Sequence, residues 1–193
     1  YENNGAANPT FTAADIATNA DGAKHVFLVD LDSDGDLDIL STSFFDNTIA
    51  WYENDGAANP TFTAANIVTN ITGALGIHVD DMDADGDMDI VVSSFTDDTI
   101  SWLENDGAAN PTFTAAAIAT SADGAKEVHV ADIDGDGDLD IVSASTLDDT
   151  IAWYENDGAA NPAWTAADIA TNADGANSVY VGDMDGDGDL DIV

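Results

Sequence analysis

The sequence lacks cysteine and arginine, and its only basic residues besides histidine are two lysines, Lys24 and Lys126. Without cysteine no disulfide can support the fold, and the redox compartment cannot be inferred. No apolar run approaches the ~18 residues that a membrane-spanning helix requires. No signal peptide is recognisable, and both ends fall inside repeated segments, so we interpret the chain as a mature fragment or as part of something longer.

Positive charge is scarce, whereas negative charge is abundant. The chain carries 39 acidic residues and a formal net charge of -37. Such a surface cannot neutralise phosphates, which excludes nucleic acids and anionic membranes as partners. Hydrophobic residues make up 45% of the sequence, which is too many for a disordered acidic tail. Self-repulsion on this scale destabilises a compact state, and we expect metal cations to offset it.

The chain is an internal repeat with a period of 51 residues. Trp51, Trp102 and Trp153 show this spacing, and WYENDGAANPTFTAANI recurs almost unchanged in the later copies. Repeats of this length indicate one array that shares a continuous core. We therefore predict a single repeat domain over residues 1–193, divided into a partial blade 1–19, three blades 20–70, 71–121 and 122–172, and a partial blade 173–193.

Each repeat alternates short apolar runs with turn signals, which predicts an all-β fold. In one copy we expect strands over 26–29, 37–45, 48–53 and 61–69, although Ala64–Ala65 also fits a helical turn. Four short antiparallel strands in about 50 residues form the blade of a β-propeller. An open β-solenoid is the alternative, but its rungs are usually shorter. The two ends together supply most of a further blade, so they would close a ring imperfectly, or their exposed edges would pair with another chain.

The chemistry of the chain is concentrated in Asp-x-Asp-x-Asp-Gly-Asp-x-Asp loops, one in each copy. Alternate carboxylates of a tight loop can converge on a dication that needs six to eight oxygen ligands, and the glycine at position 6 permits the sharp turn. We expect position 7 to contribute its backbone carbonyl and position 9 to complete the coordination. The predicted metal ligands are Asp30, Asp32, Asp34, Asp36 and Asp38; Asp81, Asp83, Asp85, Asp87 and Asp89; Asp132, Asp134, Asp136, Asp138 and Asp140; and Asp183, Asp185, Asp187, Asp189 and Asp191.

Calcium is the ion that this donor set favours, with about one Ca²⁺ per loop and four in all. An EF-hand would need a glutamate at position 12, where this chain has Ser41, Val92 or Ser143, and it would need flanking helices. Magnesium dehydrates reluctantly, and zinc prefers His or Cys, which the loops lack. The alternative is a set of solvated acidic turns that bind no metal, but four copies in register argue against it.

The motifs DLDSDGDLDI, DMDADGDMDI, DIDGDGDLDI and DMDGDGDLDI resemble FG-GAP/VCBS repeats, the blades of integrin α-like propellers. The resemblance covers the whole chain. It implies a calcium ion in the hairpin between the first two strands of each blade, held by the acids at positions 1, 3, 5 and 9 and the carbonyl at position 7. The family includes adhesion modules, lectins and non-catalytic parts of secreted proteins, commonly with seven blades.

Aromatic residues have two interpretations. Trp51, Trp102 and Trp153 either pack between blades, which we favour, or stack on sugars as in lectins. Trp164 replaces Phe11, Phe62 and Phe113 of the other copies and is expected in the core. His78 and His129 occupy the position of Phe27 and Tyr180, where they either fill space or line a central channel.

No nucleophile–base constellation is evident, so we do not expect an enzyme. We predict a calcium-stabilised adhesion or scaffold module, located outside the cell, where calcium concentrations match the weak affinity of such modules. The alternatives are a calcium-dependent lectin and a self-assembling ring or fibre protein. Expected partners beyond calcium are glycans, cell-surface or matrix proteins, and further copies of the chain through open blade edges.

Overall fold

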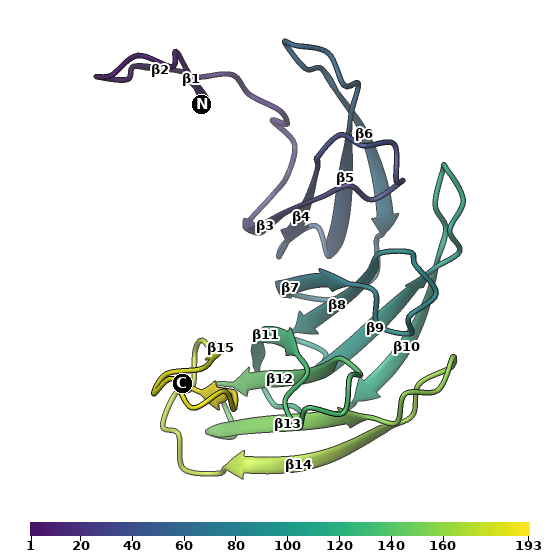
Figure 1. Cartoon of the computed structure of the whole chain (residues 1–193), viewed down its shortest axis with the longest axis vertical. Helices are drawn as coiled ribbons and strands as arrows, with labels where there is room; N and C mark the ends of the chain where they lie inside the picture. Colours follow the sequence, from purple (N-terminus) through teal and green to yellow (C-terminus); the bar gives the residue numbers. More distant parts are fainter.

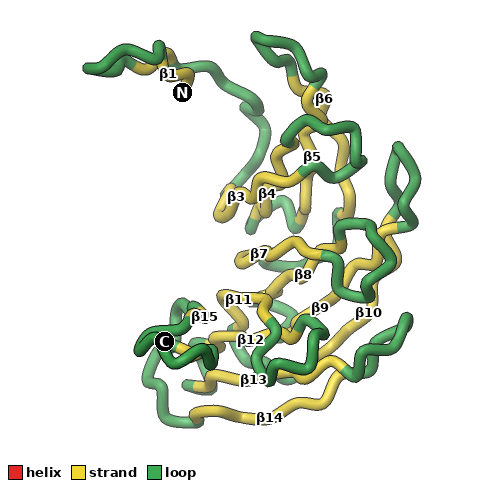
Figure 2. Tube along the Cα trace, in the orientation of Figure 1, coloured by secondary structure: helices red, strands yellow, loops and turns green.

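The computed structural model describes residues 1–193, and it consists of strands and loops without helices (Figure 2). Three sheets each contain four antiparallel strands in chain order. They are formed by β3 (Ala23–Val29), β4 (Asp38–Ser43), β5 (Thr48–Asn54) and β6 (Phe62–Val68); by β7 (Ala74–Asp80), β8 (Asp89–Ser94), β9 (Thr99–Asn105) and β10 (Phe113–Ala119); and by β11 (Ala125–Ala131), β12 (Asp140–Ser145), β13 (Thr150–Asn156) and β14 (Trp164–Ala170). The all-β prediction is confirmed, and no helix is present that could span a membrane.

The fourth predicted strand is a strand and not a helical turn. β6 pairs antiparallel with β5, with Ala64 opposite Tyr52 and Ala65 opposite Trp51. Its alanine-rich middle is exposed because β6 is the outer edge of the blade. The second strand is buried throughout in the second and third blades, and in the first blade only Ile39 of β4 is half-buried. Each repeat is therefore a four-stranded antiparallel blade rather than a solenoid rung.

The blades are arranged along an arc, with β3, β7 and β11 on its inner side and β6, β10 and β14 outside (Figure 1). Neighbouring blades touch through their inner strands, β3 with β7 and β7 with β11. The structure does not show a closed ring. β1 (Glu2–Asn3) pairs only with β2 (Phe11–Thr12), and β15 (Val181–Gly182) pairs only with β16 (Asp191–Ile192). The two terminal parts of a blade thus lie apart (Figure 1).

The core is divided among the interfaces between successive blades. One cluster joins Leu40, Ile49 and Trp51 of the first blade to Ile77 and Val79 of the second. A second cluster repeats this arrangement between the second and third blades, and a smaller one covers the third blade with β15. Trp51 and Trp102 are only 4% and 3% exposed, which supports packing over sugar stacking. Trp153 and Trp164 are half-buried against these clusters.

Four aromatic rings form a row across the inner strands. The ring centroids lie 5.4 Å apart for Phe27 and His78, 5.0 Å for His78 and His129, and 4.8 Å for His129 and Tyr180. Contact between neighbouring rings supports the space-filling interpretation. Burial, followed by the charges of His129 and His25, lowers the pKa of His78 to about 4. His78 is therefore a neutral member of the row.

This pKa predicts a specific loss of stability in acid. Between about pH 6.5 and pH 4, unfolded His78 binds a proton that the folded protein excludes, so the free energy of unfolding falls as pH falls. The loss reaches roughly 3 kcal/mol at pH 4. His78→Phe, which copies Phe27 of the first blade, should flatten the urea-unfolding stability curve in this window. Parallel curves for the variant and the wild type would contradict the assignment.

Candidate metal centres

The aspartate loops connect the first two strands of each blade, and in each loop three carboxylates converge. One carboxylate oxygen from each member of a triplet lies within 4.8 Å of the others. The triplets are Asp30, Asp32 and Asp34; Asp81, Asp83 and Asp85; Asp132, Asp134 and Asp136; and Asp183, Asp185 and Asp191. The first three combine positions 1, 3 and 5, and the fourth combines positions 1, 3 and 9. Positions 1, 3, 5 and 9 are thus represented among these clusters.

Backbone amides of the loop orient the carboxylate at position 1. In the first loop, Asp34 N donates to Asp30 Oδ1 at 3.0 Å and Gly35 N donates to Asp30 Oδ2 at 2.9 Å. Gly35 has φ +98°, a left-handed conformation that other residues adopt only with strain, so the glycine permits this turn. The second loop repeats both bonds from Asp85 and Gly86 to Asp81. The loop is therefore curled around its first aspartate.

In the three four-stranded blades, the aspartate at position 9 is buried and anchors the loop to the third strand, whereas Asp191 of the fourth loop is exposed. Asp89 is 1% exposed. Its Oδ1 accepts a hydrogen bond from Asn105 N at 2.8 Å, and its Oδ2 accepts from Met82 N at 3.3 Å and from Trp102 Nε1 at 3.0 Å. Burial raises the pKa of Asp89 to about 6, although these bonds partly oppose the shift. The Asp89 side chain therefore has a structural role, in addition to any role as a metal ligand.

The aspartate at position 7 does not belong to the cluster. The Asp36 carboxylate lies against Gly56 of the next hairpin, where a Cβ would be 2.1 Å from Asp36 Oδ2. Asp87 and Asp138 lie in the same way against Gly107 and Gly158. The expectation that position 7 contributes its backbone carbonyl rather than its carboxylate is compatible with this placement.

Sequence reasoning missed the asparagine that supports each loop. Asn105 Nδ2 donates to Met88 O at 3.0 Å, while its Oδ1 accepts from Gly107 N at 3.1 Å. Asn54 and Asn156 make equivalent bonds to Leu37 O and Leu139 O. The recurrence of Glu-Asn-Asp-Gly at 53–56, 104–107 and 155–158 is the sequence signal that marks this asparagine. The indole of Trp102 is likewise a hydrogen-bond donor to Asp89 as well as a packing residue.

The donor set and its electrostatics fit a hard divalent cation. Burial, followed by the negative charges of Asp34 and Asp38, raises the pKa of Asp32. Burial and Asp85 act in the same direction on Asp83. Converging carboxylates repel one another, and an ion bound among them would offset that repulsion. All donors are oxygens and the flanking elements are strands, so the sites suit calcium in a setting unlike an EF-hand.

The comparison with known families agrees with this repeat structure. The model of the FG-GAP-like repeat matches residues 30–92, 81–143 and 132–193, which together extend without a gap from the first aspartate loop to the last residue. Each match contains two successive aspartate loops. No curated protein matches the chain.

Three substitutions in one loop should separate anchoring from ligation. In EDTA, Asp89→Asn should destabilise the protein by about 1–3 kcal/mol, because an amide nitrogen cannot accept a hydrogen bond. Asp85→Asn should leave the melting temperature unchanged or raise it in EDTA, since it removes one repelling charge, but it should weaken calcium binding. Both effects can be measured by calorimetry.

Asp87→Asn is the matched control, because it removes the same charge from a side chain outside the cluster. Equal calcium affinities of the Asp85 and Asp87 variants would contradict the assignment. So would an Asp89 variant that melts like the wild type in EDTA.

Proposed function

The chain belongs to the FG-GAP-like repeat family, and on that premise we propose that it is a non-enzymatic, extracellular adhesion or scaffold module whose blades are stabilised by calcium. The observation that carries the proposal is the convergence of three carboxylates in every aspartate loop, at the same place in each repeat. Without bound cations, the carboxylates of all four loops would repel one another. Each calcium ion bound would cancel two negative charges and fix one hairpin.

The proposed extracellular location rests on the calcium affinity expected of such sites. Calcium modules outside cells bind with Kd of about 10⁻⁴–10⁻³ M, which matches the calcium concentration there. The loops here are exposed over much of their length, so their carboxylates lose hydration when they bind an ion, which weakens the binding. An exposed site of this kind suits a calcium-rich medium rather than the cytosol.

The non-enzymatic role is supported by the use of the buried acids. A carboxyl group with a raised pKa is a candidate for general acid or base catalysis. Asp89 and Asp140 have raised pKa values because of burial, but backbone amides hold them: Asn105 N and Asn156 N each donate at 2.8 Å. Structural anchoring accounts for these two groups without any chemistry on a substrate.

The proposal predicts that thermal stability follows calcium concentration. At a free calcium concentration ten times Kd, each occupied site should add about 1.4 kcal/mol, so the melting temperature should rise clearly above its value in EDTA. Titration calorimetry should give about four sites. Magnesium at the same concentration is the control and should act more weakly. An identical melting temperature in calcium and EDTA would refute the proposal.

One observation favours self-association as a second function. Val26 and Leu28 on β3 are 63% and 60% exposed, whereas their counterparts Ile77 and Val79 on β7 are 1% and 5% exposed. The blade preceding β7 covers that face, and it has nearly the same sequence as the other blades. We therefore propose that the exposed face of β3 accepts a blade from a second copy, which would join copies head to tail.

This second proposal predicts concentration-dependent association in calcium. Val26→Glu combined with Leu28→Glu should abolish it without unfolding the chain, because both side chains are already exposed. Sedimentation velocity measures the effect. Ala115→Glu, at an exposed residue in the middle of the outer strand β10, is the control and should associate like the wild type. A strict monomer at about 100 µM wild-type protein would exclude head-to-tail assembly, since even micromolar affinity would be visible there.

A further inference from the structure

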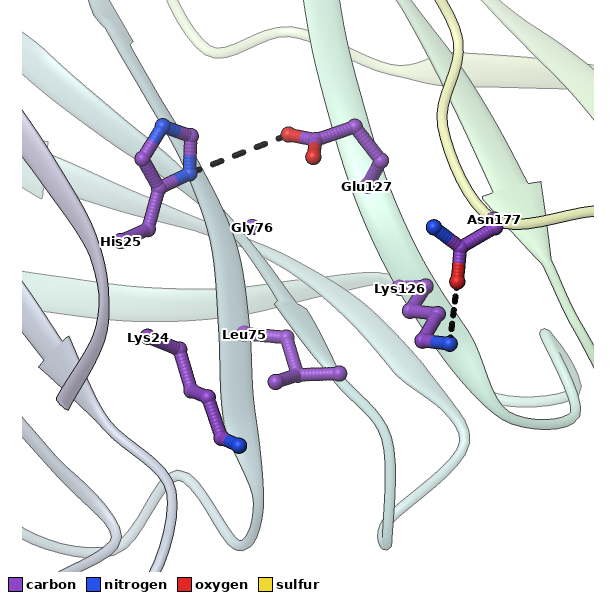
Figure 3. Close-up of a pocket in the computed structure, with 7 residues that line it drawn as sticks. All are labelled: Lys24, His25, Leu75, Gly76, Lys126, Glu127 and Asn177. Atoms are coloured by element: carbon purple, nitrogen blue, oxygen red, sulfur yellow. Dashed lines mark hydrogen bonds and ion pairs between the residues drawn. The ribbon is translucent and has the colours of Figure 1, made fainter. Parts of the chain in front are cut away.

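The only two lysines of the chain line the same pocket. It has a volume of about 280 Å³ and is lined by Lys24, His25, Leu75, Gly76, Lys126, Glu127 and Asn177 (Figure 3). Glu127 is the single acid among these residues, in a chain that has 39. The whole lysine charge of the protein is therefore concentrated at one place.

The repeat brings the two lysines together although they lie two periods apart in sequence. Lys24, Leu75, Lys126 and Asn177 are equivalent positions of the four copies, near the starts of the inner strands. Both lysines lie in β-bulges, because the register with the second strand shifts between Ala23 and His25 and between Ala125 and Glu127. A bulge redirects the side chain of its extra residue. Figure 3 shows both ammonium groups at the same end of the pocket, on either side of Leu75.

Neither ammonium group has a carboxylate partner. The structure contains one contact of the ion-pair type, between His25 Nδ1 and Glu127 Oε1 at 3.8 Å. Lys126 Nζ instead donates to the amide oxygen of Asn177, and Lys24 Nζ lies 5.5 Å from the centre of the Phe44 ring. Two like charges share a pocket and remain unpaired in a molecule dominated by acids. An anionic ligand would satisfy both.

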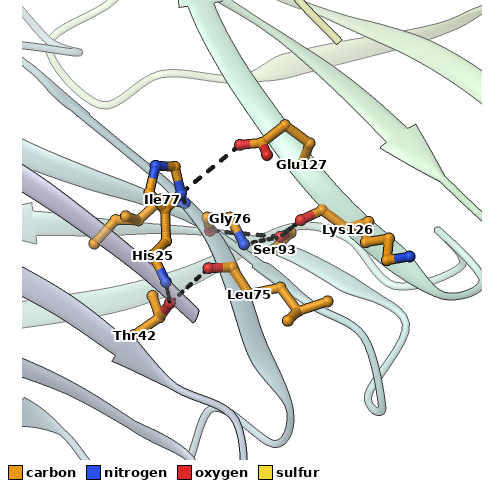
Figure 4. A network of polar contacts seen from close by, with 8 residues as sticks. All are labelled: His25, Thr42, Leu75, Gly76, Ile77, Ser93, Lys126 and Glu127. Atoms are coloured by element: carbon orange, nitrogen blue, oxygen red, sulfur yellow. Dashed lines mark hydrogen bonds and ion pairs between the residues drawn. The ribbon is translucent and has the colours of Figure 1, made fainter. Parts of the chain in front are cut away.

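The walls of the pocket are fixed by hydrogen bonds between blades (Figure 4). Thr42 Oγ1 donates to Leu75 O at 2.6 Å, and Ser93 Oγ donates to Lys126 O at 2.9 Å while accepting from Gly76 N at 2.8 Å. His25 Nδ1 accepts a hydrogen bond from Ile77 N at 3.2 Å, which fixes the imidazole at the wall of the pocket. In Figure 3 the Glu127 carboxylate lies beside His25, away from the ammonium groups. The backbone that carries both lysines is thus held in place.

We propose that this lysine pocket binds a small oxyanion, either the carboxylate of an organic acid or the sulfate or phosphate group of a small molecule. The two ammonium groups and the Asn177 amide would bind its oxygens. A long polyanion is not a suitable ligand, because the net charge of -37 repels it everywhere else on the surface. The pocket volume of about 280 Å³ is also that of a compact ligand.

The lysine pocket is separate from the aspartate loops. Lys24 lies near the start of β3, whereas the first loop begins after the last residue of β3, Val29. Six residues of strand place Lys24 and Asp30 about 20 Å apart. Oxyanion binding can therefore be lost while calcium binding is retained, and the two proposals can fail independently.

The test is titration calorimetry of the whole chain in about 1 mM calcium, with sodium succinate and sodium sulfate as separate probes. The wild type should show saturable binding of at least one probe, and the stronger probe identifies the class of oxyanion. Lys24→Gln and Lys126→Gln should each weaken binding about tenfold, because each removes a charged hydrogen bond. Glu127→Gln should strengthen it, because it removes the one opposing charge in the pocket.

Asn59→Asp is the control for net charge, since it adds one negative charge in an exposed loop and should leave binding unchanged. Thermal melting in calcium checks that all variants are folded. Two outcomes would overturn the proposal: no saturable binding of either probe by the wild type, or lysine variants that bind like the wild type. Lysine variants that bind like the wild type would indicate that the anion binds to calcium ions in the aspartate loops instead.

Discussion

Repulsion among converging carboxylates is the constraint on which this molecule depends. The loop backbone forces it, because the amides of Asp34 and Gly35 hold Asp30 in the centre of the turn while Asp32 and Asp34 approach it. Burial is the main cause of the raised pKa of Asp32, and repulsion from the charges of Asp34 and Asp38 raises it further. Buried Asp38, Asp89 and Asp140 tie the first three loops to the third strand of their blades, which opposes opening of these loops. A divalent cation bound among these carboxylates would offset their repulsion, and the arrangement favours such binding.

Each blade also depends on its neighbours for stability. A blade of four short strands cannot cover its own apolar faces, so each core cluster is shared between two neighbours. Hydrogen bonds from the Thr42 and Ser93 hydroxyls cross the same boundaries and satisfy the carbonyls of Leu75 and Lys126 on the next inner strand. The consequence is visible where a neighbour is missing: Val26 and Leu28 are exposed, although the same positions of the next blade are buried.

The lysine pocket shows how a repeat can build a site from few residues. A residue type that occurs twice in the chain occurs at equivalent positions, and stacking of blades places those positions around one axis. The same principle aligns Phe27, His78, His129 and Tyr180 into one row. Substitution at a single repeat position therefore adjusts the chemistry of the inner surface without changing the blade.

The sequence by itself determined the features that are local. The strand pattern and the clustering of carboxylates both arise within a few residues, so period, turn residues and ligand spacing predict them. It also pointed correctly to packing for Trp51 and Trp102. Only the tertiary structure decided the role of Asn105 in holding its loop and the open arc of blades. It also decided that Val26 is exposed while Ile77 is buried, and that Lys24 and Lys126 line one pocket. Each of these depends on how strands and blades stack, and stacking joins residues that lie far apart in the chain.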